Sequence, residues 1–457
     1  MLPDDVLLEV FDFYVDKNKQ TGGDSHIHAE EWIRLVHVCR RWRNVVFRSP
    51  HRLNLRLVCT NRTPARNTLY IWPPLPLIIR DVFSYKPFDV NSIIAALMHN
   101  DRVHQVELYP SPRFDYITNS AAMQEPFSEL TDLWLDNNGN RGMLPDSFLG
   151  GTAPRLRSLK LICVPFLGLP KLLLSATHLV DLDIYGIPSL GYIPPEAMAT
   201  SLSALTSLRF LRLHFLHPPP RRAPESRHLP PPSITYSILP SLTKILFQGA
   251  SEYLEVILAR IDAPRLDYLR ITFFNQIIFD TPQLSQFISR SPMLRAPKTG
   301  HIEFCPGVVT VRFPSQTSDH GVLRVSILCR VSEWQLSSIE QICTSSMPPV
   351  STLKEFYIFE GSSSKLCWQD DVENMLWLEF LRPFAAVKNL YICGEFMPRI
   401  APALQELVEG TTEVLPTLEN IFLKGFWPLV PLHKGIEKFV AARRHTSRPV
   451  AVSRWGR

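Results

Sequence analysis

Apolar residues recur along most of this chain in one six-residue spacing, apolar–x–x–apolar–x–apolar. The first copy consists of Leu130, Leu133 and Leu135, and it extends to Asn138. Alternate residues of a β-strand point to the same side of its sheet, so each copy predicts a short strand with one buried face. The copies have their central residues at Leu133, Leu159, Leu182, Leu211, Ile245, Leu269, Phe356, Leu390 and Ile421.

The distance between copies predicts a repeating unit of one strand and one return helix. The central residues at positions 133, 159, 182, 211, 245 and 269 follow one another at intervals of 23 to 34 residues. Between several copies the apolar residues change to helical spacing, as in segments 254–261, 284–288, 339–343 and 372–376. Each such unit leaves an apolar face that only a neighbouring unit covers. The sequence therefore predicts an α/β fold over residues 59–457, a leucine-rich-repeat-like (LRR-like) solenoid with parallel strands on its concave face and helices and loops on its convex face.

Three segments depart from this regularity. Residues 217–233 are rich in Pro and predict a surface insertion, although their Pro-Pro-Pro runs also resemble ligands of aromatic-groove domains. Residues 275–335 hold less regular repeats, with candidate strands near 302–304, 308–313 and 325–327. Residues 430–457 are expected to form a terminal cap, a helix and a strand with a basic outer face.

Residues before about position 58 carry two helical patterns instead of the repeat. Pro3 stands at the start of the first, where its missing N–H costs little. The polar segment Lys17–Ser25 between the patterns is expected to be a loop. The first stripe consists of Val6, Leu7, Val10, Phe11 and Tyr14. The second consists of Trp32, Leu35, Val36, Cys39, Trp42 and Val46.

This N-terminal region resembles an F-box. Segment 1–11, MLPDDVLLEVF, resembles the opening of that motif, and segment 38–45, VCRRWRNV, followed by Ser49-Pro50, resembles its second half. Together with segment 377–384 (WLEFLRPF) and the closing segment 450–455 (VAVSRW), the layout resembles the F-box/LRR-like proteins expanded in mushroom-forming fungi.

The resemblance implies a partner for residues 1–58. An F-box docks on a Skp-type adaptor, which links it to a cullin–RING ubiquitin ligase. The chain would then be the non-catalytic substrate-recognition subunit of an SCF-type E3 ligase, located in the cytoplasm, the nucleus or both. The residues expected to bind the adaptor are Leu2, Pro3, Val6, Leu7, Val10, Phe11, Val38, Cys39 and Trp42. The alternative is a structural or scaffolding LRR-like interaction protein whose F-box-like helices only cap the solenoid.

The residues between the skeleton positions would face the concave side of the solenoid. Aromatic and Arg side chains recur there, and these types dominate the hot spots of protein interfaces. Strands also favour aromatic residues for reasons of packing alone, so the pattern is compatible both with a binding surface and with ordinary strand composition. The residues expected to bind a protein substrate are Trp134, Tyr185, Phe210, Arg212, Tyr268, Arg270, Tyr357, Tyr391 and Phe422.

The remaining chemistry of the sequence argues against an enzyme. The sequence contains no phosphate-binding loop, nucleophile elbow, zinc-protease motif or dinucleotide fingerprint. His26 and His28 stand near carboxylates and could hold a metal, but they fall in a polar segment that is more typical of a solvated loop. We therefore expect no cofactor and no metal. A net charge of +5 from 48 basic and 43 acidic residues is weak evidence for nucleic-acid binding.

The sequence also indicates where the protein is located. No apolar run is long enough to span a membrane, no signal peptide is visible, and the scattered cysteines are typical of reduced thiols in an intracellular protein. We expect neither a nucleic-acid nor a membrane partner.

Overall fold

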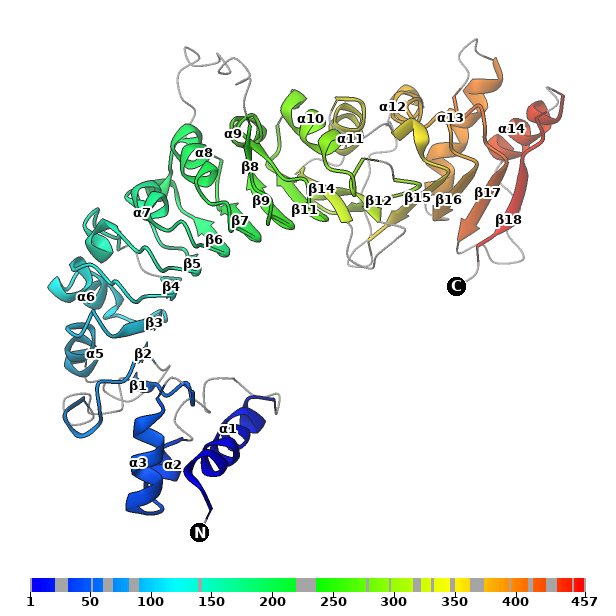
Figure 1. Cartoon of the computed structure of the whole chain (residues 1–457). Coiled ribbons are helices and arrows are strands. Elements are labelled where there is room, and N and C mark those ends of the chain that lie inside the picture. Colours follow the sequence, from blue (N-terminus) through cyan, green and yellow to red (C-terminus); the bar gives the residue numbers. More distant parts are fainter. Residues whose placement is uncertain are drawn as a thin grey trace. The chain divides into compact units, whose positions relative to one another are not determined.

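The computed structural model shows a helical N-terminus followed by alternating strands and helices (Figure 1). The contacts divide the chain into unit 1, Met1–Ile193, and unit 2, Pro194–Arg457, and each is described by itself. The structure describes residues 2–20, 32–50, 52–60, 69–81, 90–138, 142–218, 236–276, 279–295, 297–314, 322–329, 333–345, 350–361, 374–393, 396–409, 414–424, 434–445 and 448–455.

Unit 1 begins with three helices, α1 (Asp4–Gln20), α2 (Trp32–Val36) and α3 (Arg40–Arg48). The carbonyl of Pro3 accepts the Leu7 N–H at 3.1 Å, so Pro3 caps α1 without having to donate a hydrogen bond itself. Asp4 and Asp5 occupy the first turn, where the helix dipole favours negative charge. The predicted loop beginning at Lys17 is wrong for its first residues, because α1 continues to Gln20.

The second predicted helical stripe is divided between α2 and α3. Cys39 adopts an extended backbone and caps α3, its Sγ accepting the Trp42 N–H at 3.5 Å. The Arg43 Nε donates to the Val36 carbonyl at 3.1 Å and satisfies a group at the end of α2. Apolar spacing alone could not reveal this break, because the side chains on both sides of it still share one face.

The strands of unit 1 form a parallel sheet in sequential order. They are β1 (Leu57–Thr60), β2 (Leu77–Arg80), β3 (Val103–Leu108), β4 (Asp132–Asp136), β5 (Ser158–Ile162) and β6 (Asp181–Ile187). The return segments are α5 (Val90–Leu97), α6 (Phe114–Thr118), α7 (Leu169–Ser175) and the 3₁₀ turns η2 (Ala121–Gln124), η3 (Phe148–Gly151) and η4 (Ser189–Gly191).

The asparagine that follows β4 differs from the expected one. Asn138 is exposed, whereas Asn137 is fully buried and its Nδ2 donates to the Gly142 carbonyl at 3.2 Å. The Asn137 N–H also donates to the Ile162 carbonyl at 2.9 Å. The buried amide therefore continues the hydrogen bonding of the sheet past the end of the strand.

Unit 2 contains a ten-stranded sheet and a separate pair, β8 (Ser237–Ile238) with β10 (Ile261–Asp262). In spatial order the large sheet consists of β7 (Phe210–Phe215), β9 (Lys244–Gly249), β11 (Tyr268–Phe273), β14 (Val322–Leu328), β13 (Val308–Pro314), β12 (Thr299–Cys305), β15 (Glu355–Glu360), β16 (Asn389–Cys393), β17 (Asn420–Lys424) and β18 (Ala451–Arg454). Its helical segments are α8 (Pro195–Ser203), α9 (Ser251–Leu258), α10 (Pro282–Arg290), α11 (Glu333–Ser345), η6 (Val350–Thr352), α12 (Asn374–Leu381), α13 (Met397–Glu409) and α14 (Lys434–His445).

The strands β12, β13 and β14 interrupt the parallel order of unit 2. After α10 the chain skips two strand positions, forms β12 beside β15, and returns through β13 and β14 toward β11. β13 is antiparallel to both of its neighbours, and Gly307 with φ +78° makes the tight turn that leads into it. The sequence predicted three strands here, but only the structure shows that they are inserted in reverse spatial order.

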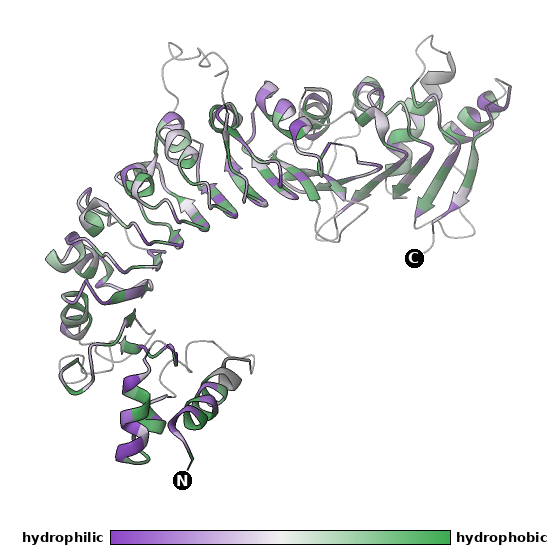
Figure 2. Cartoon of the chain, in the orientation of Figure 1, coloured by the Kyte–Doolittle hydropathy of each residue, from purple (hydrophilic) through white to green (hydrophobic). Residues whose placement is uncertain are grey.

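The central residue of each of the nine skeleton copies lies on a strand, and the inward positions of the copies form the core. Leu133, Leu159, Leu211, Phe356 and Ile421 are examples of central residues that are almost completely buried. Hydrophobic and hydrophilic residues alternate along the strands (Figure 2), and within each unit the helices lie on one face of the sheet (Figure 1). The predicted fold class is therefore confirmed: a helical F-box-like region followed by LRR-like strand–helix units. The face of each sheet away from the helices is called the open face below.

Candidate protein-binding surfaces

The first candidate surface is the exposed side of α1. Val6 and Val10 are 42% and 49% exposed, and Phe13 is 67% exposed. These residues follow helical spacing on one face, whereas Leu7 and Phe11 lie on the other and are buried. Leu7 and Phe11, which the sequence predicted to contact an adaptor, are enclosed by the chain itself, so neither side chain is exposed for such a contact. Phe13 was missed, although its position seven residues after Val6 would have placed it on the exposed face.

The connection between α2 and α3 extends this surface. Leu2, Pro3, Val38 and Cys39 are exposed, and Trp42 is half-buried. The Trp42 ring packs at 4.7 Å, between centroids, on the ring of Phe11. The name apolar patch is used below for Leu2, Val6, Val10, Phe13 and Val38.

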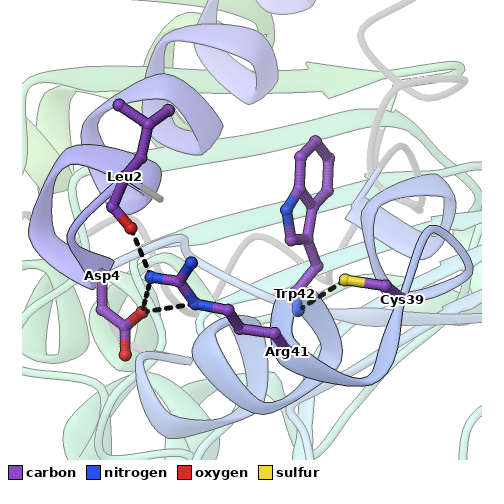
Figure 3. Close-up of polar contacts among 5 residues, drawn as sticks. All are labelled: Leu2, Asp4, Cys39, Arg41 and Trp42. Carbon is purple, nitrogen blue, oxygen red and sulfur yellow. Dashed lines mark hydrogen bonds and ion pairs between the residues drawn. The ribbon is translucent and has the colours of Figure 1, made fainter.

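Polar contacts fix α1 against α3 next to the apolar patch. Arg41 forms an ion pair with Asp4, Nη2 to Oδ1 at 2.7 Å, and also donates to the carbonyl of Leu2 (Figure 3). Arg52 forms a second ion pair, with Glu9. Both pairs are too exposed to stabilise the fold much. The first joins α1 to α3, and the second joins α1 to the segment that follows α3.

The opposite side of the helices packs against the start of the strand array. The Trp32 Nε1 donates to the Arg56 carbonyl at 3.0 Å, and the Trp32 ring lies 5.3 Å from that of Trp72. Phe47 contacts both indole rings, at 6.1 Å in each case. The helical module is thus anchored on one side, and on the other the side chains of the apolar patch remain exposed.

The second candidate surface is the open face of unit 1, where side chains of opposite charge alternate along one row. Glu107, Trp134, Lys160 and Asp183 are register partners on β3 to β6. The Lys160 Nζ lies 3.8 Å from the centroid of the Trp134 ring, a cation–π contact. At one end Arg80 binds Glu107 in a buried ion pair, Nε to Oε2 at 2.6 Å. Tyr185, predicted on this face, is exposed.

The third candidate surface is the open face of unit 2, which carries a ladder of stacked rings. His301, Tyr357, Tyr391 and Phe422 are register partners on β12, β15, β16 and β17. Their successive centroids are 4.5, 4.0 and 4.5 Å apart, with planes within 10° of parallel. Trp455 packs edge-on against both tyrosines.

Burial of the ladder shows in the acid–base properties of its members. Burial and then the neighbouring charge of Arg312 lower the pKa of His301 to about 4. Burial raises the pKa of Tyr357, and its contacts with Tyr391 and Glu355 add to the effect. Both side chains are therefore held neutral near pH 7, and the ladder presents an uncharged aromatic surface.

Basic and aromatic residues alternate on the other half of this open face. The Lys244 Nζ lies 5.6 Å from the centroid of the Phe210 ring and 4.8 Å from that of Tyr268. Arg212 on β7 and Arg270 on β11 lie two residues further along their strands, on the same face. All nine residues predicted to bind substrate therefore lie on open faces, but the structure divides them between the two units.

Three further residues lie on the open face of unit 2 and were not predicted from the sequence, namely His301, Arg312 and Arg324. They lie on β12, β13 and β14, where the six-residue skeleton is absent. Strict alternation along β12 was the available signal, because His301 stands between Gly300 and the buried Ile302.

The other candidates from the sequence contribute less. His26 and His28, and residues 219–233 of the predicted insertion, lie outside the described residues. Among the residues that the structure does describe, no group of His, Cys, Asp and Glu could hold a metal ion, and no helix could cross a membrane. The basic C-terminal cluster is partly structural, since Arg443 is buried and donates to the carbonyls of Val414 and Leu415.

Comparison with known proteins finds a family match for the N-terminal region. Residues 1–56 match the family described as F-box-like. The comparison with curated proteins finds no match to the chain. The chain thus carries an F-box-like domain at its N-terminus, followed by long, mostly parallel sheets consistent with LRR-like repeats.

Proposed function

We propose that this chain is a substrate-recognition subunit of an SCF-type cullin–RING E3 ubiquitin ligase. Its F-box-like domain would bind a Skp-type adaptor, and its LRR-like units would bind a protein target. The single observation that carries the proposal is the apolar patch within residues 1–56, the segment that matches the F-box-like family.

The apolar patch has the physical character of a binding site. Val10 and Phe13 on α1 and Val38 in the connection between α2 and α3 expose large apolar side chains, and a group of this kind costs free energy as long as water covers it. The ion pair of Arg41 with Asp4 holds the two helices in place before a partner arrives. A partner that covered the patch would therefore gain apolar burial without having to order the site first.

The proposed role is positioning rather than chemistry. F-box proteins are typically non-catalytic adaptors, and ubiquitin transfer would be carried out by other subunits of the ligase. Holding a target and the ligase on one chain raises their effective concentration toward each other. The cytoplasm and the nucleus are the compartments that this role implies.

The second candidate function is a scaffolding protein whose F-box-like helices only cap the repeat array. The contacts of Trp32 and Phe47 with Trp72 favour it, because they pack these helices against the segment that leads into β2. A cap with no further role would, however, be expected to present polar residues outward, which Val6, Val10 and Phe13 do not.

Co-purification with a Skp-type adaptor tests the proposal. The full chain is expected to capture the adaptor, and the double substitution Val6→Asp/Val10→Asp is expected to abolish capture, since it places two charges in the apolar patch. Leu190→Asp is the control, a more exposed apolar residue of unit 1 outside the patch, and should leave capture unchanged. If the folded wild-type chain captures no adaptor, the scaffolding function is the better account.

A further inference from the structure

Three arginines lie side by side on the open face of unit 2. Arg270 on β11 is the register partner of Arg324 on β14, and Arg324 is the partner of Arg312 on β13. The inward residues next to them, such as Val325 and Val311, are buried, so the three guanidinium groups share the face away from the helices. Neighbouring strands are about 4.8 Å apart, so this arginine row extends over about 10 Å.

The arginine row carries an electrostatic cost that the described part of the chain does not offset. Like charges directly opposite on adjacent strands destabilise a sheet. Within the described residues none of the ion pairs includes Arg270, Arg312 or Arg324, and the Nε of Arg324 is buried without a hydrogen-bond partner. The neighbouring Glu303 accepts instead from the Cys305 thiol, Sγ to Oε1 at 3.8 Å.

The arginine row continues directly into the aromatic ladder. Arg312 is the register partner of His301, the first ring of the ladder, and Tyr357 and Tyr391 follow on the next two strands. A line across the sheet at one level therefore passes from exposed positive charge to uncharged rings. Arginine and aromatic side chains are the types that anchor protein interfaces most strongly.

We propose that this line binds an extended acidic segment of a partner protein, with carboxylates over Arg270, Arg324 and Arg312 and an apolar residue against the aromatic cluster that Trp455 forms with Tyr357 and Tyr391. The inference rests on the proposed function and names the class of target that the ligase subunit would recognise. Charge complementarity carries it, because carboxylates would relieve the repulsion within the arginine row and would pair with guanidinium groups in bidentate fashion.

The geometry favours this occupant over two others. Positive charge spread across three strands suits several successive carboxylates better than a single phosphate, whose oxygens lie within about 3 Å of one another. The rings of Tyr357 and Tyr391 are stacked on each other at 4.0 Å, so their flat faces are already covered. Single-stranded nucleic acid needs such faces free for its bases, and these two rings do not offer them.

Fluorescence anisotropy on the full chain without adaptor tests the inference. The probe is a labelled peptide with a run of glutamates followed by Leu-Phe-Leu, and its binding should weaken as salt is added. Arg270→Glu and Arg312→Glu should each weaken binding by about tenfold or more. Arg295→Glu is the matched control, an exposed arginine that follows α10, and should bind as the wild type does. Arg312→Gln, which removes charge without reversing it, serves if a charge reversal disturbs folding.

The outcomes separate the alternatives. The inference is supported if Arg270→Glu and Arg312→Glu weaken binding of the peptide and Arg295→Glu does not. It is overturned if the peptide does not bind, if Arg295→Glu weakens binding equally, if only a phosphoserine peptide lacking glutamates binds, or if a poly-uridine RNA binds more tightly through the same arginines. A chain that captures the adaptor but not the peptide refutes this inference alone, and a chain that binds only the peptide refutes the ligase function alone.

Discussion

The open faces of the two units are built from the same kind of strands but differ in how charged side chains are arranged on them. In unit 1 the row alternates in sign, with Arg80 bound to Glu107 and Lys160 lying over Trp134 beside Asp183. In unit 2 the row brings Arg270, Arg324 and Arg312 together with no alternating acid. The first row contains an internal ion pair, Arg80 with Glu107, whereas the second brings like charges together at a cost in free energy that an acidic ligand would remove. The same repeated backbone can therefore carry a row of side chains that stabilises the fold or a row that is suited to bind a ligand. Which of the two it carries depends on the side chains that the strand register brings together.

The largest expected effect comes from breaking the buried pair of unit 1. Glu107→Leu leaves the Arg80 guanidinium buried without its carboxylate and should lower the free energy of unfolding by about 3–5 kcal/mol. Urea unfolding followed by circular dichroism measures this. The corresponding truncation in unit 2, Arg312→Ala, should cost little, because that side chain is exposed and unpaired among the described residues. Equal losses in the two variants would contradict the comparison.

A smaller effect is expected on acidification of unit 2. The pKa of His301 is lowered to about 4, below its ordinary value of 6.5, so the folded state favours the neutral ring. Its contribution to stability is therefore present above pH 6.5 and is lost as the pH falls through about 4. Between pH 6.5 and about 4, the His301→Phe variant should therefore lose less stability than the wild type. Melting temperature measured as a function of pH tests this. His178→Phe replaces an exposed histidine of unit 1, and it should follow the wild-type profile.

The smallest expected effect is a gain in stability. Arg324→Leu removes the middle charge of the arginine row and its buried, unbonded Nε, and it should raise the free energy of unfolding by roughly 0.5–1 kcal/mol. The same substitution should weaken binding of the glutamate peptide. A variant that became less stable would show that the charges of the row are already balanced, and the contrast between the two units would not hold.

Local regularity explains how much of the molecule could be predicted. The spacing of residues such as Leu133 and Leu159 fixes both the strand and its buried side, because only one alternation encloses the leucines. The same reasoning placed Tyr357, Tyr391 and Phe422 on one face. It failed at Cys39, where a helix stops without a change of face, and at Asn138, where the neighbouring Asn137 makes the buried contacts.

The binding surfaces could be predicted only in part for a related reason. Stripe analysis grouped Val6 with Leu7 and Val10 with Phe11, although the packing of α1 on α3 buries one member of each pair. Apolar residues can lie on more than one side of a helix. Which side is buried depends on a contact with a segment distant in the chain. The F-box-like match of residues 1–56 identifies the domain but not its exposed side.

The sequence by itself determined the repeating strands, the F-box-like N-terminus and the inward and outward residues of each regular strand, because these depend on spacing over a few residues. Only the tertiary structure decided that β12, β13 and β14 enter the sheet in reverse order and set Arg270, Arg324, Arg312 and His301 in one row. Such neighbours are chosen by hydrogen bonding between strands far apart in the chain, and no local pattern records that choice.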